Sequence, residues 1–313
     1  PGRKCWQRAI TERAIHLDPD STEPLVLRAE IALQSGDFQE AYDRALVASR
    51  LEELSRLSGD EATPTPQTNP YPILLLVRAL DGLGRTTEAI AAIATALPHV
   101  WERLPLMLER LQLISRSQDA DALLGALQEL SQEYPDEPIV LAPLAKSLAE
   151  VGDTENAMRA AQKALQTAQS SSERDEASCL DVGTQSQLHL LLGRMLREAG
   201  QLDQAIHHLN EAVRQSPLSL DAYLELGRAY QDRRQHMQAL QIYNQAMKIT
   251  PDQPEPYYHA GLALKESKDY LGAESMLRRA ADLAPTDLII HRQLGAVVAL
   301  NLVHNRRKKP MEV

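Results

Sequence analysis

The chain has 313 residues, a formal net charge of −10 and two cysteines. This acidic balance argues against a general nucleic-acid binder, because phosphate backbones are bound by Lys and Arg. Cys5 and Cys179 form neither a disulfide framework nor a zinc pattern, so a reducing, cytoplasmic location is the default expectation. The longest apolar run, residues 73–77, is far shorter than the ~18 residues of a membrane span, so no membrane span is expected.

Residues 1–20 predict a single helix, the second half of a helix pair that lacks its first half. Ala14 and Pro19 lie at the positions that close the later pairs, which suggests a chain cut from something longer or missing its true N-terminus. The first complete pair starts near Thr22, with Gly36 in the turn between its helices. Leu51 and Leu54 continue the apolar spacing of the second helix, which we therefore expect to extend past Leu54.

Further pairs are predicted to start near residues 70, 104, 138, 186, 220 and 254, and a last single helix is predicted over 288–303. Most of these starts are 34 residues apart, and two insertions, at about 55–69 and 170–185, lengthen the spacing to 48. Each insertion follows a second helix. The spacing suggests an internal duplication of a three-repeat block.

The period is clearest over 186–287, where three stretches of 34 residues align, starting at Ser186, Leu220 and Pro254. Within each stretch two helical stripes are separated by a turn, and a proline ends the second helix. Small residues recur where the two helices must approach closely. The agreeing positions include Gly193, Gly227 and Gly261 at position eight, Ala205, Ala239 and Ala273 at position twenty, and Pro217, Pro251 and Pro285 at position thirty-two.

This period and pattern resemble the tetratricopeptide repeat. The resemblance covers nearly the whole chain and is weakest over 104–135. It implies an all-α fold, a right-handed superhelical solenoid of stacked antiparallel helix pairs over residues 1–303, followed by a basic tail at 304–313. It also implies a groove lined by the first helices, in which a partner peptide or protein is bound.

Position nine of the repeat, which the resemblance places in that groove, is basic in four of eight copies. The groove candidates are Arg78, Lys146, Arg194, Arg228 and, at position five, Tyr258. We expect an acidic or carboxylate-bearing partner. The alternative is that each cation pairs with an acid four residues further along its helix, such as Glu150, Glu198 or Asp232. The family's Lys and Asn clamp for C-terminal carboxylates is not matched.

No catalytic constellation, cofactor motif or metal site is evident, so an enzyme is not expected. The Gly82–Gly84 segment lies between two helices rather than after a strand, and His207 and His208 are adjacent on a helix, so they point in different directions. We expect the apolar segment 288–303 to be covered by a further helix, an adjoining domain or a second copy of the chain.

The function that these features favour is a protein-interaction scaffold that binds its partner in the groove. The alternative is a regulatory or sensor segment of a larger multidomain protein whose enzymatic or NTPase part lies outside this chain.

Overall fold

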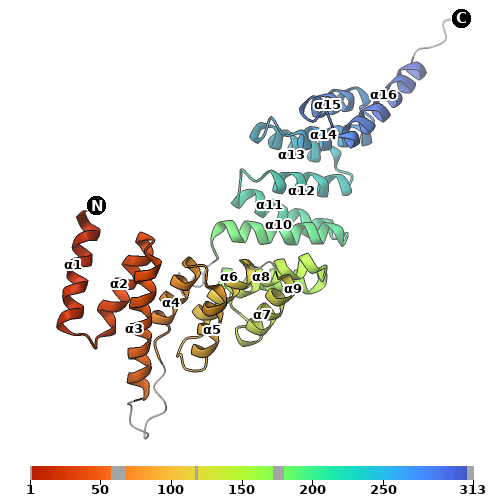
Figure 1. Cartoon of the computed structure of the whole chain (residues 1–313). Coiled ribbons are helices and arrows are strands. Elements are labelled where there is room, and N and C mark those ends of the chain that lie inside the picture. Colours follow the sequence, from red (N-terminus) through yellow and green to blue (C-terminus); the bar gives the residue numbers. More distant parts are fainter. Residues whose placement is uncertain (1, 58–67, 117–118, 172–179, 309–313) are drawn as a thin grey trace, which may run out of the picture. The chain divides into compact units, whose positions relative to one another are not determined.

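The computed structural model describes residues 2–57, 68–116, 119–171 and 180–308 (Figure 1). This part of the chain forms sixteen α-helices. They are α1 (Gly2–Leu17), α2 (Thr22–Ser35), α3 (Phe38–Leu57), α4 (Pro70–Gly82), α5 (Thr86–Ala96), α6 (Leu104–Arg116), α7 (Ala120–Glu133) and α8 (Pro138–Val151). The others are α9 (Thr154–Ser171), α10 (Val182–Glu198), α11 (Leu202–Gln215), α12 (Leu220–Asp232), α13 (His236–Ile249), α14 (Pro254–Glu266), α15 (Tyr270–Leu283) and α16 (Leu288–Lys308).

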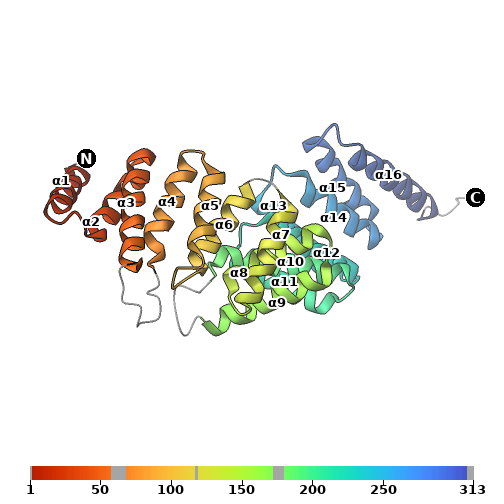
Figure 2. The same ribbon diagram turned by 60° about the horizontal axis from the view of Figure 1, so that its bottom comes forward.

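Within each of two parts of the chain most helices pack against the next one, for example α2 with α3, α10 with α11 and α14 with α15, which confirms the predicted all-α fold of stacked helix pairs. They belong to two compact units, here called unit 1 (Pro1–Leu130) and unit 2 (Ser131–Val313). Figure 2 shows α1 to α6 of unit 1 following one another as a row. That residues 1–303 form one solenoid stays a prediction. Most residues of the two expected insertions lie outside the described residues.

The turn inside each helix pair has a backbone reason. All residues with positive φ in the described chain lie at position fifteen of a repeat: Gly36, Gly84, Gly152, Gly200, Arg234 and Lys268. In the first of these turns the Asp37 amide donates to the Ala32 carbonyl at 2.9 Å, so the left-handed residue lets the chain close the helix end and reverse direction. The Gly82–Gly84 segment is therefore a turn between two helices, as expected.

Helix starts follow local signals. Pro70, Pro138 and Pro254 occupy the first turns of α4, α8 and α14, where a missing amide hydrogen costs nothing. The helix expected to start at Ser186 begins four residues earlier, at Val182. The reason is a cap, because the Asp181 carboxylate accepts a hydrogen bond from the Thr184 amide at 2.9 Å.

Two helices run further than their counterparts. The second helix of the Thr22 pair, α3, extends to Leu57, which confirms the expectation that it passes Leu54. The last helix was expected to end at residue 303, but α16 continues to Lys308, into the segment predicted to be a tail. Leu302 occupies position fifteen of this repeat but does not adopt the left-handed conformation seen there in other repeats, and the helix continues.

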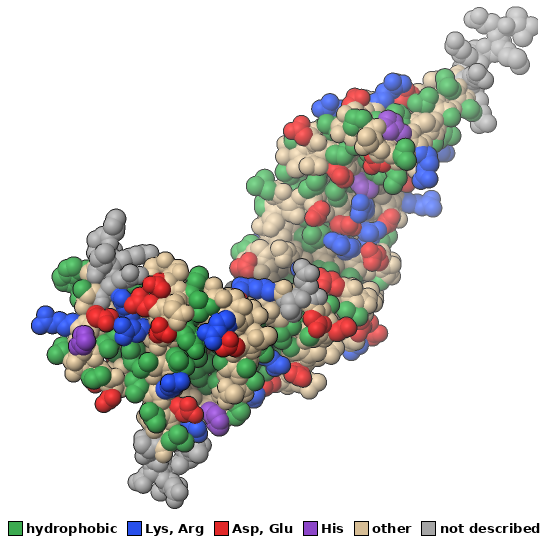
Figure 3. All heavy atoms as spheres, in the orientation of Figure 1, with side chains coloured by type: hydrophobic (Ala, Val, Ile, Leu, Met, Phe, Trp, Pro, Cys, Tyr) green, Lys and Arg blue, Asp and Glu red, His purple; other side chains and the backbone are tan. Residues whose placement is uncertain are grey.

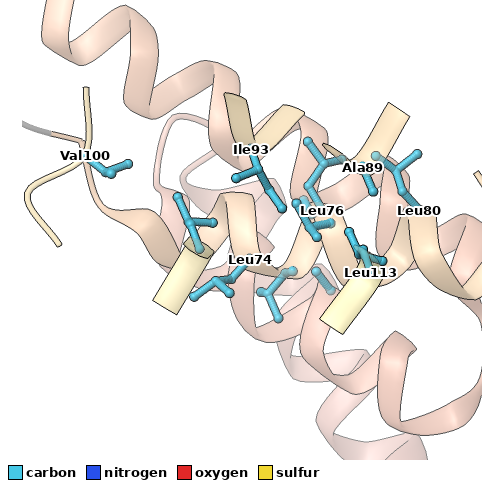
Figure 4. Packing of buried hydrophobic residues seen from close by; sticks show 12 residues of the cluster. Leu74, Leu76, Leu80, Ala89, Ile93, Val100 and Leu113 are labelled. Carbon is cyan, nitrogen blue, oxygen red and sulfur yellow. The ribbon is translucent and has the colours of Figure 1, made fainter. Parts of the chain in front are cut away.

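The core of unit 1 is centred on α4, which is buried on most of its surface. Leu74, Leu76 and Leu80 of α4 pack with Ala89 and Ile93 of α5, and Val100 and Leu113 close the cluster (Figure 4). In unit 2 the core runs between paired helices. There the side chains of Leu209, Tyr243 and Leu277 lie directly over the glycines at position eight of their repeats.

Candidate functional site

The first helices of the repeats in unit 2 form one continuous face. In succession α8 contacts α10, α10 contacts α12, and α12 contacts α14. Successive second helices, in the described part of the unit, make at most weak contacts with one another. Because the stack is tighter on the side of the first helices, that side is the inner one, and it carries the groove candidates Lys146, Arg194 and Arg228.

A buried carboxylate organises the centre of this face. Glu225 of α12 is only 7% exposed. Its Oε1 accepts a hydrogen bond from Arg228 Nη1 at 2.8 Å, and its Oε2 accepts one from Arg197 Nε at 3.2 Å. Arg194 Nε lies 3.9 Å from Oε1, so three guanidinium groups surround one carboxylate. On the side of the molecule in view in Figure 3, Lys and Arg side chains of unit 2 lie among Asp and Glu side chains.

The contacts of the arginines repeat along the stack. The residue at position nine of one repeat contacts the residue at position six of the next repeat. Arg194 and Glu225 are such a pair, as are Arg228 and His259, whose Nη2 and Nε2 atoms lie 2.9 Å apart. In unit 1, Arg78 donates to Glu109 at 2.5 Å in the same register. The arginines therefore pair with nearby acids of the chain, as the alternative held, but the acids are Glu225 and Glu109 and not those four residues further along each helix.

Lys146 is the exception to this pattern. The residue at position six of the next repeat is Leu191, which offers no charge. No ion pair or hydrogen bond of the Lys146 ammonium group is found within the described residues. The lysine is thus a cation on the inner face without an acidic partner in the part of the chain that the structure describes.

A pocket of about 850 Å³ lies between α8 and α10 at this lysine. Lys146 and Arg194 both line it. Its apolar lining includes Ile139, Pro143, Leu190 and Leu191, and Glu150 and Asp181 also line it. Ile139 and Leu190 occupy positions two and five of their repeats, and neither was among the candidates chosen from the sequence.

The other two candidates of unit 2 lie outside this pocket. Arg228 is held by Glu225 and His259, outside this pocket. Tyr258 packs into the core of the last repeats with Leu277 and Val297, and its ring stands edge-on to His259 at 5.1 Å. Tyr258 is therefore mainly a packing residue in this structure.

Burial lowers the pKa of two neighbouring histidines of α10 and α11. Burial, together with the neighbouring His189 and His207, lowers the pKa of His208 to about 4. Its Nδ1 lies 3.0 Å from Nδ1 of His189, whose pKa is also lowered by burial. In the described ranges no group of three or more His, Cys, Asp or Glu side chains is placed to hold a metal ion. No helix among the described residues is long and apolar enough to cross a membrane.

Comparison with known proteins agrees with the repeat pattern. Two family models of the tetratricopeptide repeat match residues 196–265 and 254–287. The comparison with curated proteins found no match. Among solved structures, YrrB, described as a TPR protein with an unusual peptide-binding site, is similar with a TM-score of 0.53 at 16% identity, over 66% of this chain and 96% of that one.

Two further structures are similar at lower scores. MamA from Desulfovibrio magneticus RS-1 has a TM-score of 0.49 at 20% identity, over 58% of this chain and 96% of its own. A tetratricopeptide repeat protein from Parabacteroides merdae ATCC 43184 has a TM-score of 0.48 at 16% identity, over 88% and 98%. From the 34-residue pattern, the stacked helix pairs and the two matching repeat models, we conclude that residues 196–287 of the chain are tetratricopeptide repeats.

Proposed function

We propose that the chain is a protein-interaction scaffold that binds a carboxylate-bearing peptide segment of a partner protein in the pocket between α8 and α10. The observation that carries this proposal is the pairing of a spacious, partly apolar pocket with Lys146, a cation that no acid of the described chain neutralises. An ammonium group placed in this way attracts a negative ligand without first breaking an internal ion pair.

Arg194 adds a second cation on the opposite wall. Its side chain is 46% exposed and its closest acid, Glu225, is 3.9 Å away and already bonded to two other arginines. The guanidinium therefore keeps donors free to bind a carboxylate, for which its planar fork is well suited. Glu150 and Asp181 restrict where a carboxylate could lie, so we expect it between Lys146 and Arg194.

The apolar lining would supply affinity for a neighbouring side chain of the same peptide. Ile139 is 41% exposed, and it lies with Pro143 and Leu191 along the pocket. Burial of an aliphatic or aromatic residue there would exclude water from the charged contacts and strengthen them. YrrB, with the same fold, is described as having a peptide-binding site, which supports the class of ligand by analogy of fold alone.

The test is selection of a displayed random peptide library on the purified chain. Peptides enriched by the chain should contain Asp, Glu or a free C-terminal carboxylate beside an apolar residue. Lys146→Glu should lower the affinity for an enriched peptide by at least about tenfold, and added salt should shrink the difference between the two proteins. Lys146 is preferred over Arg194 and Arg228 for charge reversal, because new carboxylates beside Glu225 would disturb folding.

The matched control is Arg159→Glu, which reverses an exposed charge on α9, a second helix. This variant should bind the peptide as the unaltered chain does. If Lys146→Glu folds and binds enriched peptides with unchanged affinity, the pocket is not the binding site and the proposal is wrong.

A further inference from the structure

The glycine at position eight marks the place where a second helix rests on its first helix. In three repeats of unit 2 this place is filled by a large side chain. A Cβ atom added to Gly193 would lie 2.5 Å from Leu209 Cγ, and one added to Gly227 would lie 2.3 Å from Tyr243 Cε1. At Gly261 the nearest atom would be Leu277 Cγ, at 2.7 Å.

Each of these large residues has a small partner four positions earlier on its helix. Ala205, Ala239 and Ala273 are fully buried, so the backbones of the two helices can approach there. A small residue followed four positions later by Leu or Tyr is therefore the pattern that this face of a first helix accepts. Residues four apart lie on one side of a helix, so both contact the first helix together.

Gly295 in α16 is the equivalent glycine, and it is uncovered. A Cβ atom added there meets nothing within 4 Å in the described structure. Apolar residues on the same side of α16 are exposed with it, because Leu288 is 83% and Leu302 is 59% exposed. Val297, on the opposite side, is fully buried against α14 and α15. Figure 2 shows α16 next to α15 as the last helix of unit 2.

The charge of α16 indicates what kind of helix would cover this side. The segment 288–308 contains no Asp or Glu, although the whole chain has a net charge of −10. Its charged residues are Arg292, Arg306, Arg307 and Lys308. A partner helix with acidic residues beside its apolar stripe would be attracted to this end of the chain.

We infer that the uncovered side of α16, around Gly295, is a docking surface for an amphipathic helix of a partner protein. That helix carries a small residue followed four positions later by Leu or Tyr, with acidic residues at its flanks. It lies on α16 as α15 lies on α14, with the large side chain over Gly295. This surface is separate from the pocket between α8 and α10, and neither proposal depends on the other.

The probe is a synthetic peptide with the chain's own sequence 269–286, which contains Ala273 and Leu277. Ser275→Glu and Arg279→Lys, at two positions that are exposed in α15, supply the carboxyl and amino groups of a lactam bridge that holds it helical. A fluorescent label reports its binding to the full chain by anisotropy. We expect saturable binding of one peptide per chain. Replacing Arg278 by Glu in the peptide should tighten binding, most strongly at low salt.

The decisive variant of the chain is Gly295→Leu. Its side chain points into open space and leucine favours the helix, so the chain should fold normally, but the added bulk occupies the place of the docking residue. Affinity for the peptide should drop by at least about tenfold. Gly125→Leu is the matched control, because this helical glycine of α7 also has nothing within 4 Å, and it should leave binding unchanged.

Three results would overturn the inference. The first is no binding of the bridged peptide at concentrations up to about 1 mM, which corresponds to a negligible interaction. The second is equal binding by the unaltered chain and by Gly295→Leu. The third is a dimer in sedimentation experiments that Gly295→Leu abolishes, because the occupant would then be a second copy of this chain.

Discussion

Gly227→Ala should destabilise unit 2, although alanine is the better helix former. The new Cβ would lie 2.3 Å from Cε1 and 2.5 Å from Cζ of Tyr243, whereas carbon atoms in ordinary contact are ~3.5–4.0 Å apart. The tyrosine cannot swing away easily. It is fully buried, its hydroxyl donates to Gln231 at 2.5 Å, and its ring stacks on His259 at 5.7 Å.

Two effects of this substitution oppose each other. Overpacking of a core costs about 1–3 kcal/mol, and an overlap this deep against a fixed ring belongs near the upper end. Replacement of a glycine in a helix by alanine gains about 1 kcal/mol. The steric effect is the larger, so we expect a net loss of about 1–2 kcal/mol in the free energy of unfolding.

The assay is urea unfolding of the chain followed by helical circular dichroism, with linear extrapolation to water. Gly295→Ala is the reference, because its Cβ meets nothing within 4 Å and only the helix propensity, up to about 1 kcal/mol in favour of alanine, should be felt. If Gly227→Ala stabilised the chain as much as Gly295→Ala, the account of position eight as a close contact would be refuted.

Three further changes test the packing and the charges. Ala239→Glu, at a fully buried site, should cost about 3 kcal/mol or more and reduce the helical signal of adjoining repeats, and an unchanged melting temperature would contradict this. Glu225→Gln should cost about 1–3 kcal/mol in urea unfolding, whereas the exposed Glu198→Gln should stay within about 0.5 kcal/mol. Burial and the nearby Arg228 lower the pKa of His259 to about 4, while its unfolded value is near 6.5. Because the unfolded state then binds more protons, the free energy of unfolding should fall as the pH drops from about 6.5 towards 4, and His259→Gln should flatten this slope.

Local signals in the sequence were sufficient for the helix pairs. Gly36, Gly84, Gly152 and Gly200 predict turns because glycine adopts positive φ at little cost, and each of them does so. The length of α3 followed from leucines at helical spacing with no Gly or Pro among them. The start of α10 was missed because the 34-residue period was given more weight than the Asp181 cap, although that cap is also a local signal.

The candidate site could be predicted only in part. Position nine does carry cations on the inner face, and Lys146 and Arg194 do share a pocket. What each cation faces could not be read from the sequence, because the contacting residues are far apart in it. Arg197 and Glu225, which form a hydrogen bond between α10 and α12, are separated by 28 residues. That register is set by how neighbouring first helices pack.

The sequence by itself determined that this chain forms helix pairs and where the described turns lie, because those features depend on residues within one or two turns of a helix. Only the tertiary structure decided which charges are neutralised and which surfaces are uncovered. Lys146 and Arg228 occupy the same position of the repeat, yet Lys146 lines an open pocket and Arg228 contacts His259. Gly227 and Gly295 are likewise equivalent in the pattern, but within the described residues a helix packs over Gly227 and none over Gly295, because burial depends on neighbours supplied by the folded stack.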